Sequence, residues 1–352
     1  MNKNFIVAIG FAVAGLLVAA RPAVAENMPK VELSAVGNLG ITTQYNQIEA
    51  PFWTEWIPEA TGGAVTATVR PWNEMGLTGQ EVFRLLRLGT YDVGNTVMGF
   101  LAGDAPIHEG TDLPGLTSTI AELREVTDAF RPVLEEFYAK DNQVKVLALT
   151  SYQRQILYCR DDLKGLADLK GRKIRVGGTS QADFIGYFGA TGIPMPFAEV
   201  QQALATGVLD CAITGTLGGY KAKWNQPAKY LYNLPISWAS SIQGMNINAW
   251  NRLSPEEQTI LMQQVRKLEE AIDEQNVRED ELGIQCNTGG PCSEGPASDM
   301  KLIPVSDEDV ELKREVLLNV VLPKWAQRCG DACADSWNQT VGKILDLQAK
   351  AK

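Results

Sequence analysis

The sequence predicts a two-lobed α/β fold with a long helix that braces both lobes. Three observations lead to this prediction: strands alternate with helices along the chain, one helix–glycine–strand unit occurs twice, and a long helical segment follows the second copy. At roughly 150 residues per domain, a chain of 352 residues is long enough for two domains with separate cores.

Residues 1–25 are typical of a secretory signal peptide. Lys3 provides a charged start, residues 5–20 form an apolar run, and Ala-Val-Ala at 23–25 is a cleavage site before Glu26. An uncleaved membrane anchor is the alternative, but the apolar run is short for a membrane-spanning helix. The mature protein is therefore expected in the periplasm.

In the first half of the chain, strands alternate with helices, which is typical of a largely parallel sheet covered by helices. The predicted strands are 31–36, 64–69 and 91–97, and the predicted helices are 47–60 and 79–88. A helix at 120–138 and a strand at 144–149 then link the two halves. We assign 26–149 mainly to lobe 1, with a return segment from about 238–285, and 150–237 mainly to lobe 2.

The helix–glycine–strand unit at residues 81–96 is repeated at residues 199–214. Six identities fall in one register: Glu81, Val82, Leu86, Gly89, Asp92 and Thr96 match Glu199, Val200, Leu204, Gly207, Asp210 and Thr214. Any unit of this kind shares some residues by chance, but six matches in one register indicate two related lobes.

The remaining segment, 238–352, is predicted to hold a strand crossover, the long helix and a carboxyl-terminal helical region. Residues 234–249 are predicted to form a further strand with Trp238 near its start. Ser254-Pro255-Glu256-Glu257 is a capping box with proline at the first helical position. The helix that it begins runs to about Gln285, and at ~1.5 Å per residue it reaches ~45 Å, enough to brace both lobes.

Six cysteines in an exported chain favour disulfides over metal or thiol chemistry. Two pairs bracket short segments, one a turn-rich loop and the other the end of a helix, and the remaining two cysteines lie on predicted strands of the same lobe. The expected bridges are Cys286–Cys292, Cys329–Cys333 and Cys159–Cys211. A zinc site is the alternative for the pair at 329 and 333, but no histidine stands near it.

Catalysis is not expected from these residues. The sequence has no nucleophile elbow, phosphate-binding loop or metal-ligand spacing, and its single histidine, His108, lies in a loop where a structural role is expected. The net charge of −10 argues against nucleic acid and anionic lipid as partners. An acidic ligand is still compatible, because a buried arginine outweighs a diffuse field at short range. No cofactor is predicted.

A small-anion site is expected around Arg175. This residue stands near the end of a short apolar strand, where α/β sheets hold ligands, and Gly177 and Gly178 follow it. The next helix–strand unit ends in small hydroxyl residues, Thr214 and Thr216. A guanidinium fork matches a carboxylate well. The alternative is that Arg175 pairs with a carboxylate of the protein itself.

Four segments carry a resemblance to a known family. They are D-L-K-G-R-K-I-R-V at 168–176, P-M-P-F-A-E-V-Q-Q-A-L-A-T-G-V-L-D at 194–210, G-L-T-G-Q-E-V-F-R-L-L-R-L-G-T-Y-D-V at 76–93 and A-W-N-R-L-S-P-E-E-Q at 249–258. This resembles the solute receptors of tripartite ATP-independent periplasmic (TRAP) transporters, the dicarboxylate-receptor (DctP) type. It implies a type II-like periplasmic-binding-protein fold that closes on a small organic acid and delivers it to a sodium-coupled membrane permease, with Arg175 on the ligand carboxylate.

The other candidate ligand residues follow from their places in the chain. Either Arg154 or Gln153 faces the cleft, because alternation allows only one of them to do so. Thr214 stands where the family often has asparagine, which makes it a candidate for specificity. The remaining candidates lie at strand ends of lobe 1 or supply apolar walls: Asn38, Trp72, Asn73, Glu74, Met98, Trp224 and Trp238. Core packing is the alternative for each tryptophan.

Two further functions stay open at this point. The same closed state could dock on a receptor kinase as part of a periplasmic sensor, or the cleft could belong to an exported lyase-like enzyme. The ligand's identity, a metal ion beside it, and the choice between monomer and homodimer are not decided by the sequence.

Overall fold

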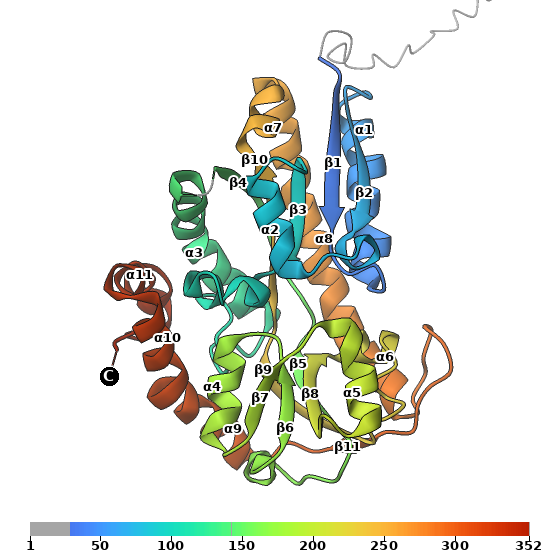
Figure 1. Ribbon diagram of the computed structural model, residues 1–352, viewed down its shortest axis with the longest axis vertical. Coiled ribbons are helices and arrows are strands. Elements are labelled where there is room, and N and C mark those ends of the chain that lie inside the picture. Colours follow the sequence, from blue (N-terminus) through green and yellow to red (C-terminus); the bar gives the residue numbers. More distant parts are fainter. Residues whose placement is uncertain (1–28, 142, 352) are drawn as a thin grey trace, which may run out of the picture.

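The computed structural model describes residues 29–141 and 143–351, and the predicted signal peptide lies outside them. Two sheets lie one beyond the other along the long axis of the molecule, and each is the centre of one lobe (Figure 1). None of the helices in the two described ranges has the length and apolar character that a membrane crossing requires. The predicted two-lobed α/β fold is confirmed.

Lobe 1 is built on a five-stranded sheet with the order β2-β1-β3-β10-β4. The first three strands run parallel, and β10 is antiparallel to both β3 and β4. The strand bounds are β1 Val31–Gly37, β2 Val65–Pro71, β3 Val93–Val97, β4 Val144–Ser151 and β10 Ser240–Asn246. The helical segments are η2 Tyr45–Glu49, η3 Phe52–Trp56, α1 Ile57–Ala60, η4 Trp72–Met75, α2 Gly79–Arg87, η5 Met98–Leu101, η6 Pro106–Glu109, α3 Ile120–Asp141 and α7 Ile247–Arg252.

Lobe 2 is built on a six-stranded sheet with the order β11-β9-β5-β8-β6-β7. Its strands are β5 Gln155–Cys159, β6 Lys173–Val176, β7 Thr191–Pro194, β8 Cys211–Gly215, β9 Tyr230–Ser237 and β11 Lys301–Ile303. Its helical segments are η7 Leu166–Leu169, α4 Thr179–Tyr187, η8 Phe197–Glu199, α5 Val200–Thr206 and α6 Thr216–Lys221. The sequence reading did not include β11, which pairs in parallel with the edge of β9.

The repeated unit has the same structure in both lobes. In lobe 1, Asp92 accepts a hydrogen bond from the backbone N–H of Ser34 on β1 at 2.8 Å. In lobe 2, Asp210 accepts one from the backbone N–H of Lys173 on β6 at 2.7 Å. Each aspartate therefore fixes its strand beside the neighbouring parallel strand. The register that follows places Arg175 of β6 where β1 has Val36, so only lobe 2 has a cation at this position.

The chain passes between the lobes twice within the sheets, at residues 152–154 and 238–239. The single strand predicted at 234–249 was wrong: β9 ends before Trp238, β10 starts after Ala239, and α7 begins at Ile247. Ala239 has a φ of 59°, a left-handed conformation that breaks an extended strand. Asp112 accepts hydrogen bonds from the backbone N–H groups at 238 and 239, at 2.8 and 2.6 Å, and so holds this crossover.

The predicted long helix is α8, Pro255–Thr288, which extends three residues beyond the expected end and spans about 51 Å at ~1.5 Å per residue. Its capping box forms as predicted, with Ser254 and Glu257 bonding each other's backbone N–H. Asn276 donates to the Ser151 carbonyl in lobe 1 and Asn287 donates to the Thr216 carbonyl in lobe 2, both at 2.9 Å. The helix therefore braces both lobes (Figure 1).

The carboxyl-terminal helices cross back from lobe 2 to lobe 1 on another side of the molecule. They are α9 Asp307–Val316, η9 Leu317–Val321, α10 Leu322–Cys329, α11 Asp331–Trp337, η10 Asn338–Gly342 and α12 Lys343–Leu345. Asp309 of α9 accepts hydrogen bonds from the Tyr232 hydroxyl and the Leu166 backbone of lobe 2. Trp325 of α10 donates to the Pro106 carbonyl of lobe 1 at 2.7 Å.

The three predicted disulfides are present. Cys159 and Cys211 lie directly opposite each other on the antiparallel strands β5 and β8. Cys286–Cys292 closes the loop that follows α8, and Cys329–Cys333 links α10 to α11. The zinc alternative for the last pair is excluded by this bond.

Candidate functional site

A cavity of about 90 Å³ lies between the lobes, several times the volume that one water needs. Lobe 1 contributes Thr42, Thr43 and Met98 to its walls, while lobe 2 contributes Arg175 and Thr214. We call this space the inner cavity. A ligand inside it contacts both lobes at once.

Arg175 is the central charged group of the inner cavity. It is 3% exposed, and its guanidinium donates to the Ile213 carbonyl at 2.9 Å and the Met195 carbonyl at 3.2 Å. The rings of Trp224 and Phe197 lie 5.8 and 6.0 Å from the guanidinium carbon. Backbone carbonyls and ring faces therefore orient this cation but leave its charge uncompensated.

The electrostatics of Arg175 favour an anionic ligand. Within the described ranges no carboxylate lies within ion-pair distance of its guanidinium, so the alternative of a protein carboxylate partner is not realised. Burial lowers the pKa of Arg175 to about 10, because the charged form is removed from water without a counter-ion. A ligand carboxylate entering the cavity supplies the missing charge and a bidentate acceptor.

The structure places Gln153 and Arg154, the two alternative candidates for the cleft, in different roles. Gln153 lines the inner cavity, but its carbonyl accepts from the backbone N–H of Leu217 and Gly218, and its amide donates to Glu279 at 2.7 Å. Arg154 points away and pairs with Asp280 of α8 at 2.8 Å. Gln153 therefore shapes the wall of the cavity, and Arg154 joins lobe 2 to the long helix.

A wider groove of about 700 Å³ adjoins the inner cavity and holds three more of the predicted residues. Trp72, Asn73 and Trp224 line it. We call it the outer groove.

Four other predicted residues line neither space. Asn38 is fully buried and its amide donates to Ser241 of β10 at 3.3 Å, away from the cleft. Thr216 faces α8 and bonds Asp280 at 3.3 Å. Trp238 packs in the core with Ile120 and Leu123. Glu74 is exposed on the surface. Position at a strand end did not predict the direction of these side chains.

Glu109 is a residue that the sequence analysis missed. It comes from η6 of lobe 1, lines the inner cavity, and accepts a hydrogen bond from the backbone N–H of Ser180, at the start of α4 in lobe 2, at 2.8 Å. A Cβ at Gly178 would lie 2.8 Å from the Glu109 carboxylate, so glycine permits this approach. Burial raises the pKa of Glu109, and the Ser180 hydrogen bonds oppose that rise. Gly178 thus allows Glu109 of lobe 1 to approach lobe 2 closely.

His108, next to Glu109, has the structural role that was expected. Its Nδ1–H donates to the Ala105 carbonyl at 2.7 Å, and its Nε2 accepts from the Tyr138 hydroxyl. Burial lowers the pKa of His108 to about 4, so the ring is neutral at pH 7 and adds no charge to the cavity.

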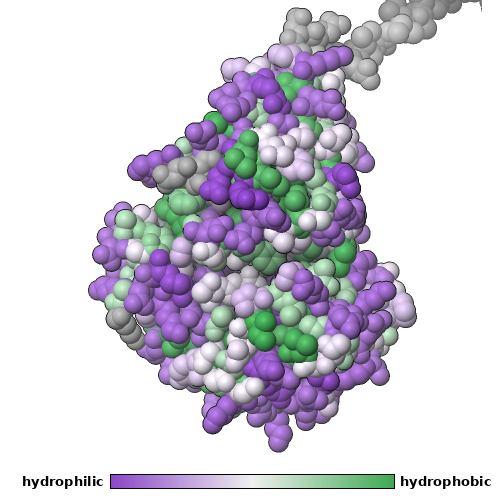
Figure 2. All heavy atoms as spheres, in the orientation of Figure 1, coloured by the Kyte–Doolittle hydropathy of each residue, from purple (hydrophilic) through white to green (hydrophobic). Residues whose placement is uncertain are grey.

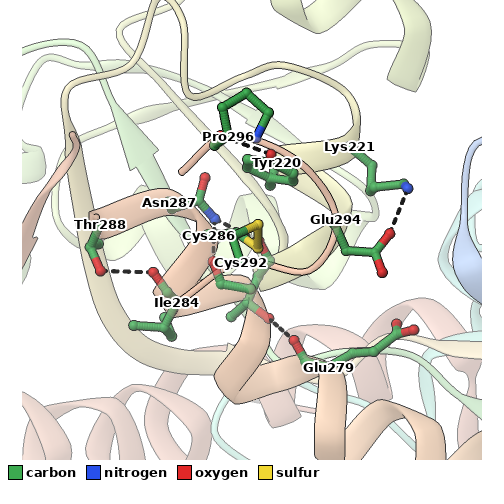
Figure 3. The surroundings of a disulfide bond; sticks show 12 residues. Tyr220, Lys221, Glu279, Ile284, Cys286, Asn287, Thr288, Cys292, Glu294 and Pro296 are labelled. Carbon is green, nitrogen blue, oxygen red and sulfur yellow. Dashed lines mark hydrogen bonds and ion pairs between the residues drawn. A yellow bond between two sulfur atoms is a disulfide. The ribbon is translucent and has the colours of Figure 1, made fainter. Parts of the chain in front are cut away.

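Lys221 lines the inner cavity but already has a counter-ion. Figure 3 shows its ammonium facing Glu294, at 2.8 Å, in the loop that follows the Cys286–Cys292 disulfide. Tyr220, the preceding residue, donates to the Pro296 carbonyl of the same loop at 3.0 Å. The loop therefore holds Glu294 on Lys221, which leaves Arg175 as the cation available to a ligand among the described residues of the cavity.

Two lobes joined by crossing strands, with a buried cation between them that lacks a counter-ion, define a two-lobed solute-binding protein. The model of the family "bacterial extracellular solute-binding protein, family 7" (DctP) matches residues 41–319, and the chain belongs to this family. Members are binding proteins, so the lyase-like alternative is set aside.

Two curated relatives support the family assignment. The 2,3-diketo-L-gulonate-binding periplasmic protein of Escherichia coli (strain K12) is 28% identical over 225 residues, which cover 62% of this chain and 67% of that protein. A monocarboxylate 2-oxoacid-binding periplasmic protein of Nostoc sp. is 26% identical over 210 residues, 58% of this chain and 57% of that protein. Both are periplasmic, in agreement with the predicted location.

Solved structures share the fold over most of the chain. A TRAP periplasmic solute-binding protein from Desulfovibrio salexigens with bound orotic acid superimposes with a TM-score of 0.80 at 18% identity, covering 90% of this chain and 100% of that one. The Bordetella pertussis extracytoplasmic receptor DctP7, which binds pyroglutamic acid, gives 0.75 at 21% identity, covering 88% and 99%. At these identities the likeness establishes the fold.

Proposed function

We propose that this protein captures a small organic acid in the interlobe cleft and delivers it to a sodium-coupled TRAP membrane permease. The observation that carries the proposal is Arg175, a buried cation at the cavity wall with no carboxylate partner among the described residues. The relatives support it, since the ligands named for them, a 2-oxoacid, orotic acid and pyroglutamic acid, are all carboxylic acids. The permease partnership is what the family implies.

In this proposal the lobes are mobile units, with 26–149 and the return segment on one side and 150–237 on the other. A ligand whose carboxylate binds Arg175 also touches lobe 1 near Thr42 and Met98. Because these contacts exist together only in the closed state, the ligand shifts the population toward closure. The closed surface is then the one that the permease recognises.

The test is a binding measurement with matched acid and amide pairs. The mature protein is freed of bound solute by partial unfolding and refolding, and calorimetry is run with a panel of mono- and dicarboxylic acids and their neutral amides. Binding of at least one acid, with its amide bound at least 100-fold more weakly, is the expected result. An amide that binds as well as its acid, or a panel with no binder, contradicts the proposal.

The closed state has a second contact between the lobes, at the edge of the ligand site. Arg328 of α10, on the lobe 1 side, pairs with Asp183 of α4 in lobe 2 and also lies 3.5 Å from the Glu109 carboxylate. Arg328→Met removes both contacts, which leaves Glu109 without its cation and Asp183 with only the exposed Lys324. We expect ligand affinity to fall about tenfold through faster dissociation, because closure becomes less favourable.

Lys324 provides the matched control for this variant. It lies one helical turn earlier, is 54% exposed in its side chain, and pairs with the same Asp183 at 3.2 Å. Lys324→Met should change affinity by less than about threefold, as exposed ion pairs contribute little. Stopped-flow dissociation of the ligand measures both variants, and equal rates for Arg328→Met and the wild type would show that this contact plays no part in closure.

A further inference from the structure

The outer groove continues the inner cavity toward the surface. The two spaces share wall residues from both lobes, among them Leu39, Phe100, Gly177 and Phe197. A ligand held at Arg175 can therefore extend outward into the groove without leaving the cleft. The residues that line the groove therefore determine which chemical group the ligand can carry beyond its carboxylate.

Those walls carry an aromatic pair from each lobe. In lobe 1, Trp72 and Phe100 pack edge to face with ring centroids 6.3 Å apart. In lobe 2, Phe197 and Trp224 pack at 5.0 Å with an interplanar angle of 34°. All four residues line the groove. Figure 2 shows that both lobes have hydrophobic surface on the pictured face. Such rings favour another planar ring, stacked or edge-on, beyond the gain from burial alone.

The charge distribution disfavours a second carboxylate on the ligand. No charged side chain of the described residues lines the outer groove. In the inner cavity, Lys221 is neutralised by Glu294, and the carboxylates of Glu109 and Asp112 bond backbone N–H groups. A second carboxylate would therefore be buried without a partner, at a high cost.

The hydrogen-bonding side chains that line the groove are uncharged amides and hydroxyls: Asn73, Thr78, Gln80, Thr179 and Gln201. The indole N–H groups of Trp72 and Trp224 are buried and have no acceptor among the described residues. The amide and hydroxyl side chains can bond a ligand oxygen next to the ring, such as a carbonyl or hydroxyl.

We propose that the ligand is a monocarboxylic acid that bears an aromatic ring, with its carboxylate on Arg175 and its ring between the two aromatic pairs of the outer groove. This inference rests on the proposed function, since it takes Arg175 as the carboxylate anchor. It adds the class of ligand: an aryl-substituted monocarboxylic acid, in place of a dicarboxylate.

Calorimetry with matched acids tests the proposal. Phenylacetate is compared with acetate, phenylpyruvate with pyruvate, and both aryl acids with succinate and glucuronate. We expect each aryl acid to bind more than tenfold tighter than its short analogue and than the other two acids. Tighter binding of succinate, glucuronate or a short acid would overturn the aromatic subsite while leaving carboxylate capture intact. Absence of binding by every acid would overturn both.

Variants of the groove give a second readout. Phe100 is half-buried and lines both the groove and the inner cavity, so Phe100→Ala should weaken aryl-acid binding at least fivefold more than it weakens binding of the short acid. Binding of the short acid also shows that the variant is folded. Tyr187→Ala, at an aromatic residue that is 46% exposed and lines neither space, is the matched control and should bind both acids as the wild type does. Equal losses for both acids in Phe100→Ala would contradict the subsite.

Discussion

Arg175→Met is expected to abolish ligand binding, with a loss of affinity of roughly 100-fold or more, equivalent to about 3 kcal/mol. The ligand carboxylate would enter a buried site from which its counter-ion has been removed, and an uncompensated buried charge is strongly unfavourable. Calorimetry with the tightest-binding acid measures the effect. An affinity within threefold of the wild type would remove Arg175 from the site.

The same variant should not destabilise the unliganded protein. Burial lowers the pKa of Arg175 to about 10, which shows that its charge is held at a cost in the absence of ligand. Methionine fills similar space without a charge, so we expect an equal or higher melting temperature together with the loss of ligand-induced stabilisation. This combination distinguishes a ligand anchor from a structural arginine.

Arg154 is the matched control, because it is the other arginine that the sequence placed near the cleft. It pairs with Asp280 outside the cavity, and removing it leaves that buried carboxylate without its partner. Arg154→Met should therefore lower the melting temperature and leave the affinity for the acid within about threefold of the wild type. Arg175→Met is thus expected to lose ligand binding and keep its stability, whereas Arg154→Met is expected to lose stability and keep ligand binding.

Much of the fold could be predicted from the sequence because its signals are local. The alternation of strands and helices, the capping box at Ser254 and the repeated unit with Asp92 and Asp210 each depend on residues close together in the chain. The strand at 234–249 was predicted as one element because its apolar residues continue across Trp238. What divides it is the conformation of Ala239, which Asp112 fixes from a distant segment, and no local pattern signals this contact.

The site was less predictable, because side-chain direction at the ends of strands depends on packing. Alternation could not decide between Gln153 and Arg154, since both lie in the crossover after β4, where the strand has ended. Glu109 carried no motif, and its role appears only when η6 meets the start of α4. The role of Phe100 could have been predicted from the repeat. The repeat aligns β3 with β8, the strand of Thr214, and Phe100 lies in η5, directly after β3 and two residues beyond Met98.

Glu49 makes the stability of lobe 1 depend on pH. Its carboxylate is fully buried, accepts from the backbone N–H of Asn38 at 3.1 Å, and has no cation within ion-pair distance in the described ranges. Burial raises the pKa of Glu49 from 4.5 to about 7. Burial raises the pKa values of Tyr45 and Tyr152, and the nearby Glu49 charge raises them further.

The direction of the pH effect follows from the raised pKa. The folded protein holds the Glu49 proton more tightly than the unfolded chain does, so this stabilisation is complete below about pH 4.5 and is lost as the pH rises toward 7. Above pH 7 the difference in pKa corresponds to on the order of 3 kcal/mol. Burial also raises the pKa of Asp112 to about 7, so the wild type loses stability from both groups over the same range.

Glu49→Gln keeps an acceptor for the Asn38 N–H and removes the charge. At pH 8 we expect the variant to be more stable to urea unfolding than the wild type by on the order of 3 kcal/mol, and at pH 4.5 the two should differ by less than about 1 kcal/mol. Glu55→Gln, at an exposed glutamate in the next helical turns, is the control and should follow the wild type at every pH. Parallel pH profiles for the wild type and Glu49→Gln would mean that Glu49 is ionised without cost in the folded state. The pH dependence would then rest with Asp112, which accepts hydrogen bonds from the crossover at residues 238 and 239.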